Sequence, residues 1–341
     1  MTPTILALSF LVLLPILAAA EPKKVGVCHG RVGDNLPSSA TVVDLLYLNN
    51  ISKARLFLPD PAVLPAFNAT GVKLMVGVPN ENLTFISTGG RDAALSWIKS
   101  NILAFLSPDQ VNYLAVGNEI LYKDQFYSPH LMPAINNLYK ALQFLGLDQK
   151  IKLSSPHASS ILAASYPPSA GAFDPSILSV LKPMLEFLAQ TNAPFMVNTY
   201  PFISYVNDPT NIALNYAMFG SDATPVIDGD LTYTNLFDAT VDSIVAAMER
   251  EGFAGVPVAV TETGWPTSGH EVATPENAAV YNGKIVERVA GGIGTPRRPG
   301  TPVEVYLFDL YDENGKNGEE FEKHFGIFKL DGTKAYNINF T

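Results

Sequence analysis

The chain has 341 residues, of which 47% are hydrophobic and 16% are charged, so it can fill a core and lacks the composition of a disordered protein. This length fits one large domain or two ordinary ones. The 22 Lys and Arg residues stand against 32 Asp and Glu residues, which gives a net charge of -10. Such an acidic chain cannot offer the cationic surface that phosphates require, so we expect no nucleic-acid partner.

The N-terminus has the pattern of a secretory signal peptide. Residues 5–17 form an apolar run, and three alanines at residues 18–20 supply the small residues of a cleavage site. The run is too short to span a membrane comfortably, and charged residues follow it at once. We therefore expect a signal peptide over residues 1–20 and a single secreted domain over residues 21–341, with no membrane segment or lipid anchor.

Two further features fit an extracellular route. Four N-x-[ST] sequons that could carry glycans begin at Asn50, Asn68, Asn82 and Asn339. Cys28 is the only cysteine, so the chain forms no internal disulfide and depends on packing for its stability. We expect Cys28 to be a small buried residue of a strand rather than a reactive thiol.

Short apolar runs alternate with longer segments of helical period along the chain. The apolar runs predict eight strands, at residues 24–30, 53–59, 73–79, 111–119, 151–157, 194–202, 256–264 and 303–311. Helical patterns lie between them, at residues 38–50, 91–106, 130–147, 175–190, 236–253 and 274–292. This repetition predicts an α/β fold, a (β/α)8 TIM barrel. An open doubly wound sheet is the alternative, but no G-x-G-x-x-G follows the first strand.

One connection is unusually long. Residues 204–234 separate the sixth strand from the next helix. Long loops after barrel strands commonly build active-site walls, so we expect an extended loop or subdomain there.

Two glutamates stand where a barrel places its catalytic residues, at the C-terminal ends of strands. Glu119 lies at the end of the fourth predicted strand and Glu262 at the end of the seventh. Two carboxylates on roughly opposite strands predict glycoside hydrolysis, in which one protonates the leaving oxygen and the other attacks the anomeric carbon or activates water. The alternative is that each caps a helix or pairs with a cationic side chain, but their shared barrel mouth favours catalysis.

Other polar and aromatic residues extend this expected site. Asn118, beside Glu119, could bond a sugar hydroxyl, and Tyr200, which follows Asn198 at the end of the sixth strand, could orient a carboxylate. An acidic run at residues 312–322 follows the eighth strand, although such a run is also typical of a solvated helix start. Flat surfaces for sugar rings, with a core position as the alternative for each, are expected at Trp265, Phe202, Tyr205, Tyr233 and Phe237.

Other chemistries lack their sequence signals. The chain has no H-E-x-x-H motif, no clustered Cys and His, no G-x-S-x-G elbow and no P-loop. Its five histidines are scattered. We therefore expect no metal ion and no organic cofactor.

These residues together resemble a known family, the plant endo-β-1,3-glucanases of glycoside hydrolase family 17. The resemblance runs in order through the whole mature chain, on the stretches GVCHGRVGDNLP, AVGNEI, SYPPSAGAF, LTYTNLFDATVDS, VTETGWP, DENGKNGEEFEKHFGIF and KAYNINF. It implies an enzyme that cuts internal β-1,3 bonds of glucans such as callose or fungal wall polymers, retains the anomeric configuration through a covalent intermediate and uses no cofactor.

The resemblance also implies roles for individual residues. Glu119 would be the general acid/base and Glu262 the nucleophile, while Asn118 and Tyr200 would contact the sugar or the nucleophile. The charged cluster that supports them would consist of Glu313, Lys316 and Glu322. The implied partner is β-1,3-glucan, and we expect a monomer that acts in the apoplast or cell wall, where it would serve defence.

Three positions depart from the family pattern. His29 stands where tyrosine is more common, Phe57 replaces the tyrosine of the second strand, and Asp309 replaces a small residue of the eighth. His29 is a candidate substrate contact that titrates near neutrality, and Phe57 lacks a hydroxyl. These changes leave two alternatives open: a hydrolase of mixed β-1,3/1,4-glucan, and a catalytically silent glucan-binding or defence protein.

Overall fold

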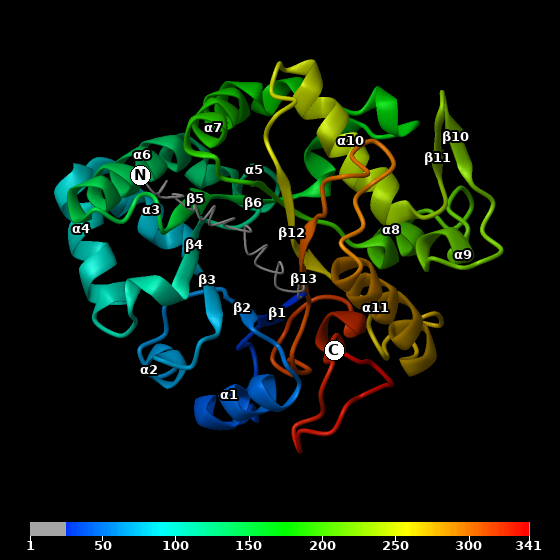
Figure 1. Cartoon of the computed structure of the whole chain (residues 1–341), viewed down its shortest axis with the longest axis horizontal. Coiled ribbons are helices and arrows are strands. Elements are labelled where there is room, and N and C mark those ends of the chain that lie inside the picture. Colours follow the sequence, from blue (N-terminus) through cyan, green and yellow to red (C-terminus); the bar gives the residue numbers. More distant parts are fainter. Residues whose placement is uncertain (1–24, 341) are drawn as a thin grey trace, which may run out of the picture.

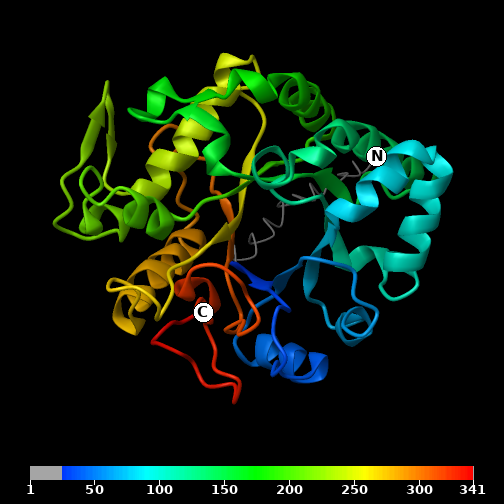
Figure 2. The same cartoon turned by 180° about the vertical axis from the view of Figure 1, so that it is seen from behind.

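A computed structural model describes residues 25–340, and the expected signal peptide lies outside them. Parallel strands form the centre of the molecule, and helices surround them (Figures 1 and 2). In sheet order the strands are β5 (Lys152–Ser154), β4 (Val111–Val116), β3 (Lys73–Val78), β2 (Lys53–Leu56), β1 (Gly26–His29), β13 (Glu304–Leu307), β12 (Val258–Thr263), β9 (Phe195–Asn198) and β6 (Pro156–Ala158).

The sheet closes into a barrel because its two terminal strands, β5 and β6, are two parts of one interrupted strand. Only Ser155 separates β5 from β6, and these strands pair with β4 and β9, respectively. Counted with β5 and β6 as one interrupted strand, the nine short strands form an eight-stranded parallel barrel. This confirms the predicted fold. The strands lie at the eight predicted apolar runs, and the residues of β1, β9 and β12 are buried throughout, as expected for a covered parallel sheet.

Helices lie at all six predicted helical segments, and the described part of the chain has five α-helices that the sequence pattern does not predict. In chain order the α-helices are α1 (Ser39–Leu48), α2 (Leu64–Phe67), α3 (Asn80–Thr88), α4 (Gly90–Ile98), α5 (Ile120–Lys123), α6 (Ser128–Leu145), α7 (Leu178–Thr191), α8 (Pro201–Asn207), α9 (Leu214–Ala217), α10 (Leu236–Arg250) and α11 (Pro275–Ala290). The five that the pattern does not predict are α2, α3, α5, α8 and α9. The helix predicted at residues 91–106 ends early and continues as a π-helical turn, Lys99–Leu103. Helix α3 was not predicted, since its sequence is largely polar, and tertiary packing against α4 and α6 stabilises it.

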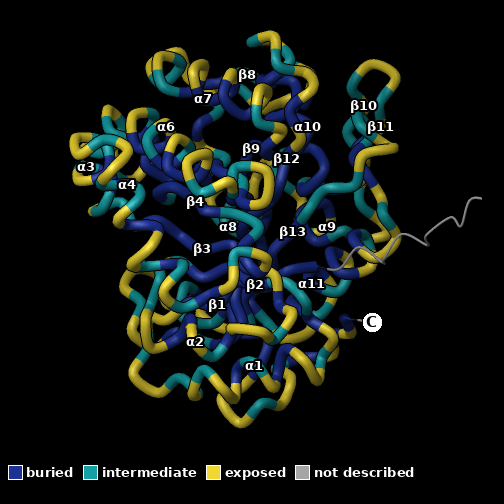
Figure 3. The backbone as a smooth tube through the Cα atoms, turned by 60° about the vertical axis from the view of Figure 1, so that its left-hand side comes forward, coloured by how far each residue is buried: buried dark blue, intermediate teal, exposed yellow. Residues whose placement is uncertain are grey.

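Side-chain caps begin three of the longer helices. Ser38 accepts from the backbone N–H of Thr41 at the start of α1, and Asn235 does the same for Asp238 at the start of α10. Thr274 caps α11 in the same way. Each cap satisfies an otherwise unpaired amide of a first turn, which explains why these helices begin there. Figure 3 shows the buried residues gathered on the central strands.

The long segment after β9 forms the expected subdomain. It contains α8, α9 and a hairpin of β10 (Val226–Asp228) and β11 (Leu231–Tyr233), which projects from the side of the barrel in Figure 1. A second hairpin, β7 (Leu162–Ala164) with β8 (Ala172–Phe173), follows β6. Asp228 joins the two regions, because its carboxylate accepts from Ser169 N and Ser169 Oγ at 2.6 Å each.

Two sequence expectations outside the site can be placed in this fold. Cys28 is fully buried in β1, as predicted, and its thiol donates to Thr261 O at 3.3 Å. Of the sequon asparagines, Asn50, Asn68 and Asn339 are exposed, whereas Asn82 lies within α3 and accepts from Trp97 Nε1 at 3.0 Å. Among residues 25–340, no helix is both long and apolar enough to cross a bilayer.

Candidate active site

A sharp turn at the end of β4 positions Glu119. The backbone takes positive φ at Gly117 (67°) and again at Glu119 (51°), and a Cβ atom at Gly117 would collide with Ile120. Asn80 Oδ1 accepts from Asn118 N at 2.8 Å, and Pro156 O accepts from Glu119 N at 2.9 Å. These bonds hold a backbone conformation that is uncommon for glutamate, so the carboxylate direction is fixed before substrate arrives.

An irregularity in β12 positions Glu262. The pairing of β12 with β9 shifts register between Val260 and Glu262, and its pairing with β13 shifts between Val260 and Thr263. Such bulges re-aim a side chain next to active sites. Glu262 thereby faces the cleft opposite its register partner, Asn198.

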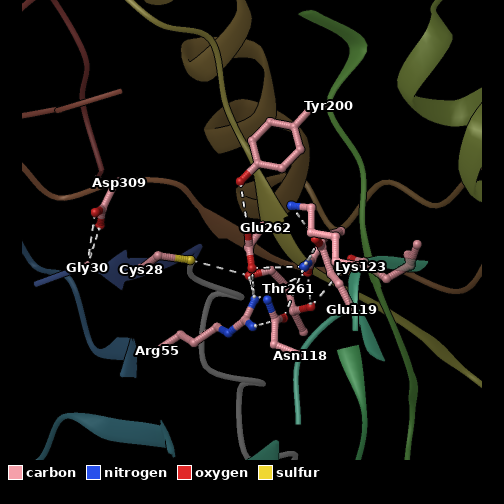
Figure 4. Close-up of polar contacts among 12 residues, drawn as sticks. Cys28, Gly30, Arg55, Asn118, Glu119, Lys123, Tyr200, Thr261, Glu262 and Asp309 are labelled. Atoms are coloured by element: carbon pink, nitrogen blue, oxygen red, sulfur yellow. Dashed lines mark hydrogen bonds and ion pairs between the residues drawn. The ribbon is translucent and has the colours of Figure 1, made fainter. Parts of the chain in front are cut away.

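Three donors hold the Glu262 carboxylate (Figure 4). Arg55 Nη1 and Asn198 Nδ2 each donate to Oε1 at 2.8 Å, and the Tyr200 hydroxyl donates to Oε2 at 2.7 Å. Arg55 also donates to Thr261 O at 3.0 Å and, through Nη2, to Asn118 Oδ1 at 2.8 Å. The carboxylate is therefore fixed from both of its oxygens.

One amide nitrogen connects the two glutamates. Asn198 Nδ2 lies 2.8 Å from Glu262 Oε1 and 3.0 Å from Glu119 Oε1. The orientation of the amide is set by its other end, because Thr261 Oγ1 donates to Asn198 Oδ1 at 2.7 Å. The second oxygen of Glu119 forms an ion pair with Lys123, whose Nζ lies 2.6 Å from Oε2.

The electrostatic environment of Glu262 combines opposing effects. Burial raises the pKa of Glu262, the Arg55 guanidinium opposes this rise, and the nearby Glu119 carboxylate adds to it. The Tyr200 hydrogen bond and Lys316 both lower this pKa. Burial, followed by the Glu262 charge, raises the pKa of Tyr200 well above its ordinary value, so its phenol stays protonated and remains a donor.

The predicted charged cluster forms after β13. Lys316 Nζ lies 3.2 Å from Glu313 Oε2, 3.9 Å from Glu322 Oε2 and 4.1 Å from the centre of the Phe308 ring. Glu313 also accepts from Val32 N at 2.7 Å. All three charged residues line the same cleft as Glu119 and Glu262.

The three positions that depart from the family pattern, His29, Phe57 and Asp309, lie close to this cluster. Asp309 is buried and accepts from Gly30 N at 3.0 Å, and burial together with Glu313 raises its pKa well above the ordinary range. Phe57 packs its ring 4.5 Å from the Arg55 guanidinium. His29 lines the cleft, and burial, reinforced by Arg31, lowers its pKa to about 4, so its ring is neutral near pH 7.

The cleft has a volume of about 1560 Å³ and crosses the C-terminal mouth of the barrel. The long segment after β9 supplies one of its walls, as expected. Besides the predicted Tyr200, the cleft lining includes two exposed aromatic side chains that the sequence analysis did not single out. Tyr166 and Tyr122 line the cleft and are 76% and 57% exposed.

Four expected sugar contacts are corrected by the structure. Trp265, Phe202, Tyr233 and Phe237 are fully buried and do not line the cleft. Trp265 donates from Nε1 to Val272 O at 2.8 Å and packs 5.1 Å from the Phe202 ring centre. Tyr205 is likewise absent from the cleft lining and packs against the core. These residues lie near strand ends, but their large apolar side chains are stabilised more by burial in the core than by exposure in the cleft.

Arg55 and Lys123 are the charged site residues that sequence reasoning missed. The sequence contains a signal for Arg55, because an arginine within a buried strand requires a buried acidic partner. Lys123 follows Glu119 by four residues, a spacing that brings side chains together on a helical turn. Within residues 25–340, no group of three His, Cys, Asp or Glu side chains could hold a metal ion.

Comparison with known proteins agrees with this geometry. Residues 25–340 match the family described as glycosyl hydrolases family 17. The chain is 38% identical to a glucan endo-1,3-beta-glucosidase of Vitis vinifera, over 99% of this chain and 97% of the relative. It is 41% identical to the basic isoform of a glucan endo-1,3-beta-glucosidase from Phaseolus vulgaris, over 93% and 90%.

Solved structures give the same result. The structure of CJP38, a β-1,3-glucanase and allergen of Cryptomeria japonica pollen, superimposes with a TM-score of 0.90 at 42% identity, covering 93% of this chain and 99% of that one. One of two plant β-glucan endohydrolases with distinct substrate specificities gives 0.86 at 39% identity, covering 93% and 100%. This chain is a member of glycosyl hydrolases family 17.

Proposed function

We propose that the protein hydrolyses internal β-1,3-glucosidic bonds of glucans with retention of configuration. The names of its relatives support the substrate class. The observation that carries the chemistry is the pair of bonds from Asn198 Nδ2, at 3.0 Å to Glu119 and 2.8 Å to Glu262. Two oxygens so joined cannot lie farther apart than the sum of these lengths, which is below the roughly 6.5 Å minimum of inverting glycosidases.

In the first step, Glu262 is the nucleophile and Glu119 the general acid. A Glu262 oxygen bonds to the anomeric carbon as the glycosidic C–O bond breaks, and the Glu119 proton goes to the departing glucan oxygen. Arg55, Asn198 and Tyr200 orient the Glu262 carboxylate for attack. The products are a covalent glycosyl-enzyme and a shortened glucan.

In the second step, Glu119 is the general base. It takes a proton from water as the water oxygen attacks the anomeric carbon, and the bond to Glu262 breaks. Both carboxyl groups return to their starting protonation states. Two inversions at one carbon leave the configuration retained.

The variant Glu262→Gln tests this proposal on laminarin, a soluble β-1,3-glucan. We expect the release of reducing ends to fall by at least about 1000-fold with the fold retained, because the amide cannot act as the nucleophile. Glu276→Gln, at an exposed position in the first turn of α11, is the matched control. Undiminished activity of Glu262→Gln would refute the assignment, and an initial product of inverted configuration by NMR would refute retention.

Mixed β-1,3/1,4-glucan is a second candidate substrate. One structural relative is described as one of two plant β-glucan endohydrolases with distinct substrate specificities, which is the reason for testing a second glucan. Product analysis on laminarin and on mixed-linkage glucan distinguishes the two activities. A silent glucan-binding protein would instead retain either polymer without releasing reducing ends.

The setting of the enzyme is also a proposal. We propose that it is secreted as a glycosylated monomer that acts on wall glucan in plant defence, without nucleic-acid or membrane partners. The apolar N-terminal run supports secretion, and the exposed sequons at Asn50, Asn68 and Asn339 support glycosylation. Expression in plant tissue, followed by fractionation of the apoplast, glycan mapping and size-exclusion chromatography, tests each part.

A further inference from the structure

A pair of short hydrogen bonds joins two segments that are 59 residues apart in the chain. The Asp228 carboxylate accepts from Ser169 N through Oδ2 and from Ser169 Oγ through Oδ1, at 2.6 Å each. Asp228 ends β10, next to the tip of the hairpin that β10 forms with β11, and Ser169 lies in the connection between β7 and β8. We call these two bonds the clasp. Bonds to an ionised acceptor are stronger than neutral ones, so the clasp is a firm link between the segments.

The clasp lies behind one wall of the cleft. Neither Asp228 nor Ser169 lines the cleft, but the residues that precede them do, namely Ile227 on one segment and Tyr166 and Pro168 on the other. The clasp therefore links lining residues from two separate segments. Because its own atoms lie outside the cleft, it acts on a ligand only by positioning that wall.

Two large side chains on this wall are left unpacked. Tyr166 is 76% exposed and Ile227 is 65% exposed, and neither belongs to a core cluster of the described residues. Exposed apolar side chains that line a cleft mark a ligand surface. The faces of a glucose ring carry C–H groups, which pack well on aromatic and aliphatic side chains. Since the wall is continuous with the cleft that holds Glu119 and Glu262, the occupant that fits it is a further part of the same glucan chain.

The connection between β7 and β8 is held firmly against α10. Ser243 Oγ, on α10, donates to Ser165 O at 2.9 Å, and a Cβ atom at Gly171 would collide with the Ser243 backbone. These two contacts lie on either side of Ser169 in the sequence. The segment that carries Tyr166 is therefore a fixed support to which the hairpin can be tied.

The hairpin of β10 and β11 is held at its base, and the clasp holds it near its tip. At the base, Tyr233 is fully buried in a small cluster with Tyr216 and Ala239. At the tip, Gly229 takes a positive φ of 61° in a turn that projects from the barrel (Figure 1). A two-stranded hairpin is marginally stable by itself. The clasp therefore fixes where the tip lies, and with it the position of Ile227.

We propose that the clasp holds Tyr166 and Ile227 as a preformed wall for glucose units away from the cleaved bond, with Asp228 as its positioning residue. Both wall residues lie on hairpins outside the barrel sheet, so only a longer glucan reaches them. The inference rests on the proposed function and adds to it a preference for chain length. A wall that is already in place spares the cost of ordering it on binding, so the clasp acts on KM and not on the chemical step.

The test is the dependence of kcat and KM on substrate length, measured on β-1,3-linked gluco-oligosaccharides of increasing length and on laminarin. For the wild type, we expect kcat/KM to rise with length until the substrate spans the wall. Asp228→Ala removes both bonds of the clasp, so the gain with length should shrink. We expect its KM for laminarin to rise about three- to tenfold with kcat unchanged, because only binding at the wall is weakened.

A conservative variant and a matched control accompany this measurement. Asp228→Asn can rebuild the clasp, because its amide accepts from Ser169 N and donates to Ser169 Oγ, so the length dependence should return toward that of the wild type. Asp230→Ala removes the same charge from the same turn, at an exposed position that does not line the cleft. Its length dependence should match the wild type.

A combined variant tests whether the clasp acts through the wall. In protein that carries Tyr166→Ala and Ile227→Ala, both wall side chains are lost, so adding Asp228→Ala should raise KM for laminarin no further. An additional rise as large as in the wild-type background would show that Asp228 acts elsewhere, which would overturn the inference.

The outcomes separate this inference from the proposed function. Equal length dependence in Asp228→Ala and the wild type overturns the inference alone, as does a loss of activity that is uniform at every length. If Asp228→Ala misfolds, Ser169→Ala removes the hydroxyl bond of the clasp and gives the same comparison with a smaller effect. Failure of the wild type to release reducing ends from laminarin and from every oligosaccharide would instead overturn the proposed function.

Discussion

Arg55 forms an ion pair with Glu262 inside the barrel, with Nη1 2.8 Å from Oε1 and only 2% of the arginine side chain exposed. Removing two charges from water is expensive, so a buried pair persists only where further hydrogen bonds satisfy it. Both partners have such bonds, since Arg55 also reaches Asn118 and Glu262 also accepts from Tyr200. The pair therefore joins β2 to β12 and orients the proposed nucleophile.

Replacing Arg55 by lysine should impair catalysis more than it impairs folding. Lysine keeps the charge but lacks the planar fork that reaches Glu262 and Asn118 together. We expect kcat/KM to fall by about 10- to 100-fold, which corresponds to one lost charged hydrogen bond. Initial rates on laminarin and thermal melting measure the two effects.

Two comparisons sharpen the Arg55 experiment. Arg55→Met should destabilise the protein by about 3–5 kcal/mol, because it leaves the Glu262 carboxylate buried without its cation. Arg91→Lys, at a surface ion pair with Asp92, should alter neither property. Wild-type kinetics in Arg55→Lys would show that the ion pair has no part in positioning Glu262.

Removing the Tyr200 hydroxyl should move the acid limb of the pH profile. The hydroxyl donates to Glu262 Oε2 at 2.7 Å and lowers the pKa of Glu262 against the effect of burial. In Tyr200→Phe this pKa rises further, so the nucleophile becomes protonated at higher pH. We expect the acid limb of kcat/KM to shift upward and the plateau to fall about 10-fold or more.

Tyr205→Phe is the control for loss of a phenol on the same segment, because Tyr205 does not line the cleft. Its profile should match that of the wild type. An unchanged acid limb in Tyr200→Phe would mean that the hydroxyl does not tune the nucleophile.

Trp265 and Tyr166 should respond to substitution in opposite ways. Trp265→Phe removes the buried bond to Val272 O, and we expect a stability loss of about 1–2 kcal/mol with KM unchanged. Tyr166→Ala alters a 76% exposed side chain on the cleft wall, so stability should stay within about 0.5 kcal/mol. Its KM for long glucans should rise roughly three- to tenfold through lost stacking.

Denaturant unfolding and kinetics on glucans of several lengths measure both effects. Each variant controls for the other, since one aromatic is buried and the other exposed. A raised KM in Trp265→Phe would indicate that Trp265 contacts the substrate, which would contradict the conclusion drawn from its burial.

Acid should destabilise the protein partly through His157. This histidine is fully buried beside Met184, and burial lowers its pKa to about 3, below its ordinary value of 6.5. The unfolded chain therefore binds the proton more readily between these values, and stability falls as pH drops from 6.5. This group accounts for at most about 3 kcal/mol between pH 6.5 and pH 4.

His157→Leu should reduce the acid-induced loss of stability, as measured by urea unfolding at several pH values. Comparing wild type with variant removes the opposite effect of Asp238, whose pKa burial raises to about 6. His130→Leu, on α6 outside the buried core, is the control. Parallel pH curves for His157→Leu and the wild type would contradict the assignment.

The barrel and the positions of Glu119 and Glu262 could be predicted because they depend on local patterns. Alternating apolar runs and helical periods define the fold, and the polar residue at a strand end marks the mouth. The alternation does not show which side chains meet across the barrel. Arg55 and Glu262 are 207 residues apart in the chain, so their contact depends on closure of the sheet.

The aromatic contacts could not be predicted for a related reason. Trp265 follows the barrel strand β12, whereas Tyr166 follows β7 of a separate hairpin, and composition alone does not tell a core ring from an exposed one. The side chain of Trp265 packs against Tyr281 of α11, whereas Tyr166 lies on the loop between β7 and β8. Sequence identifies the residue type, and tertiary packing decides which face it covers.

The buried thiol of Cys28 makes the natural chain a ready background for site-specific labelling. It is the only cysteine in the sequence and is fully buried, and burial raises its pKa well above the ordinary value, so it resists alkylating dyes and spin labels. Cysteines introduced at exposed cleft positions such as Tyr166 and Ile227 would be the reactive ones. Spectroscopic distances between such probes could follow the width of the cleft while a glucan is bound and cut, with no native cysteine first removed.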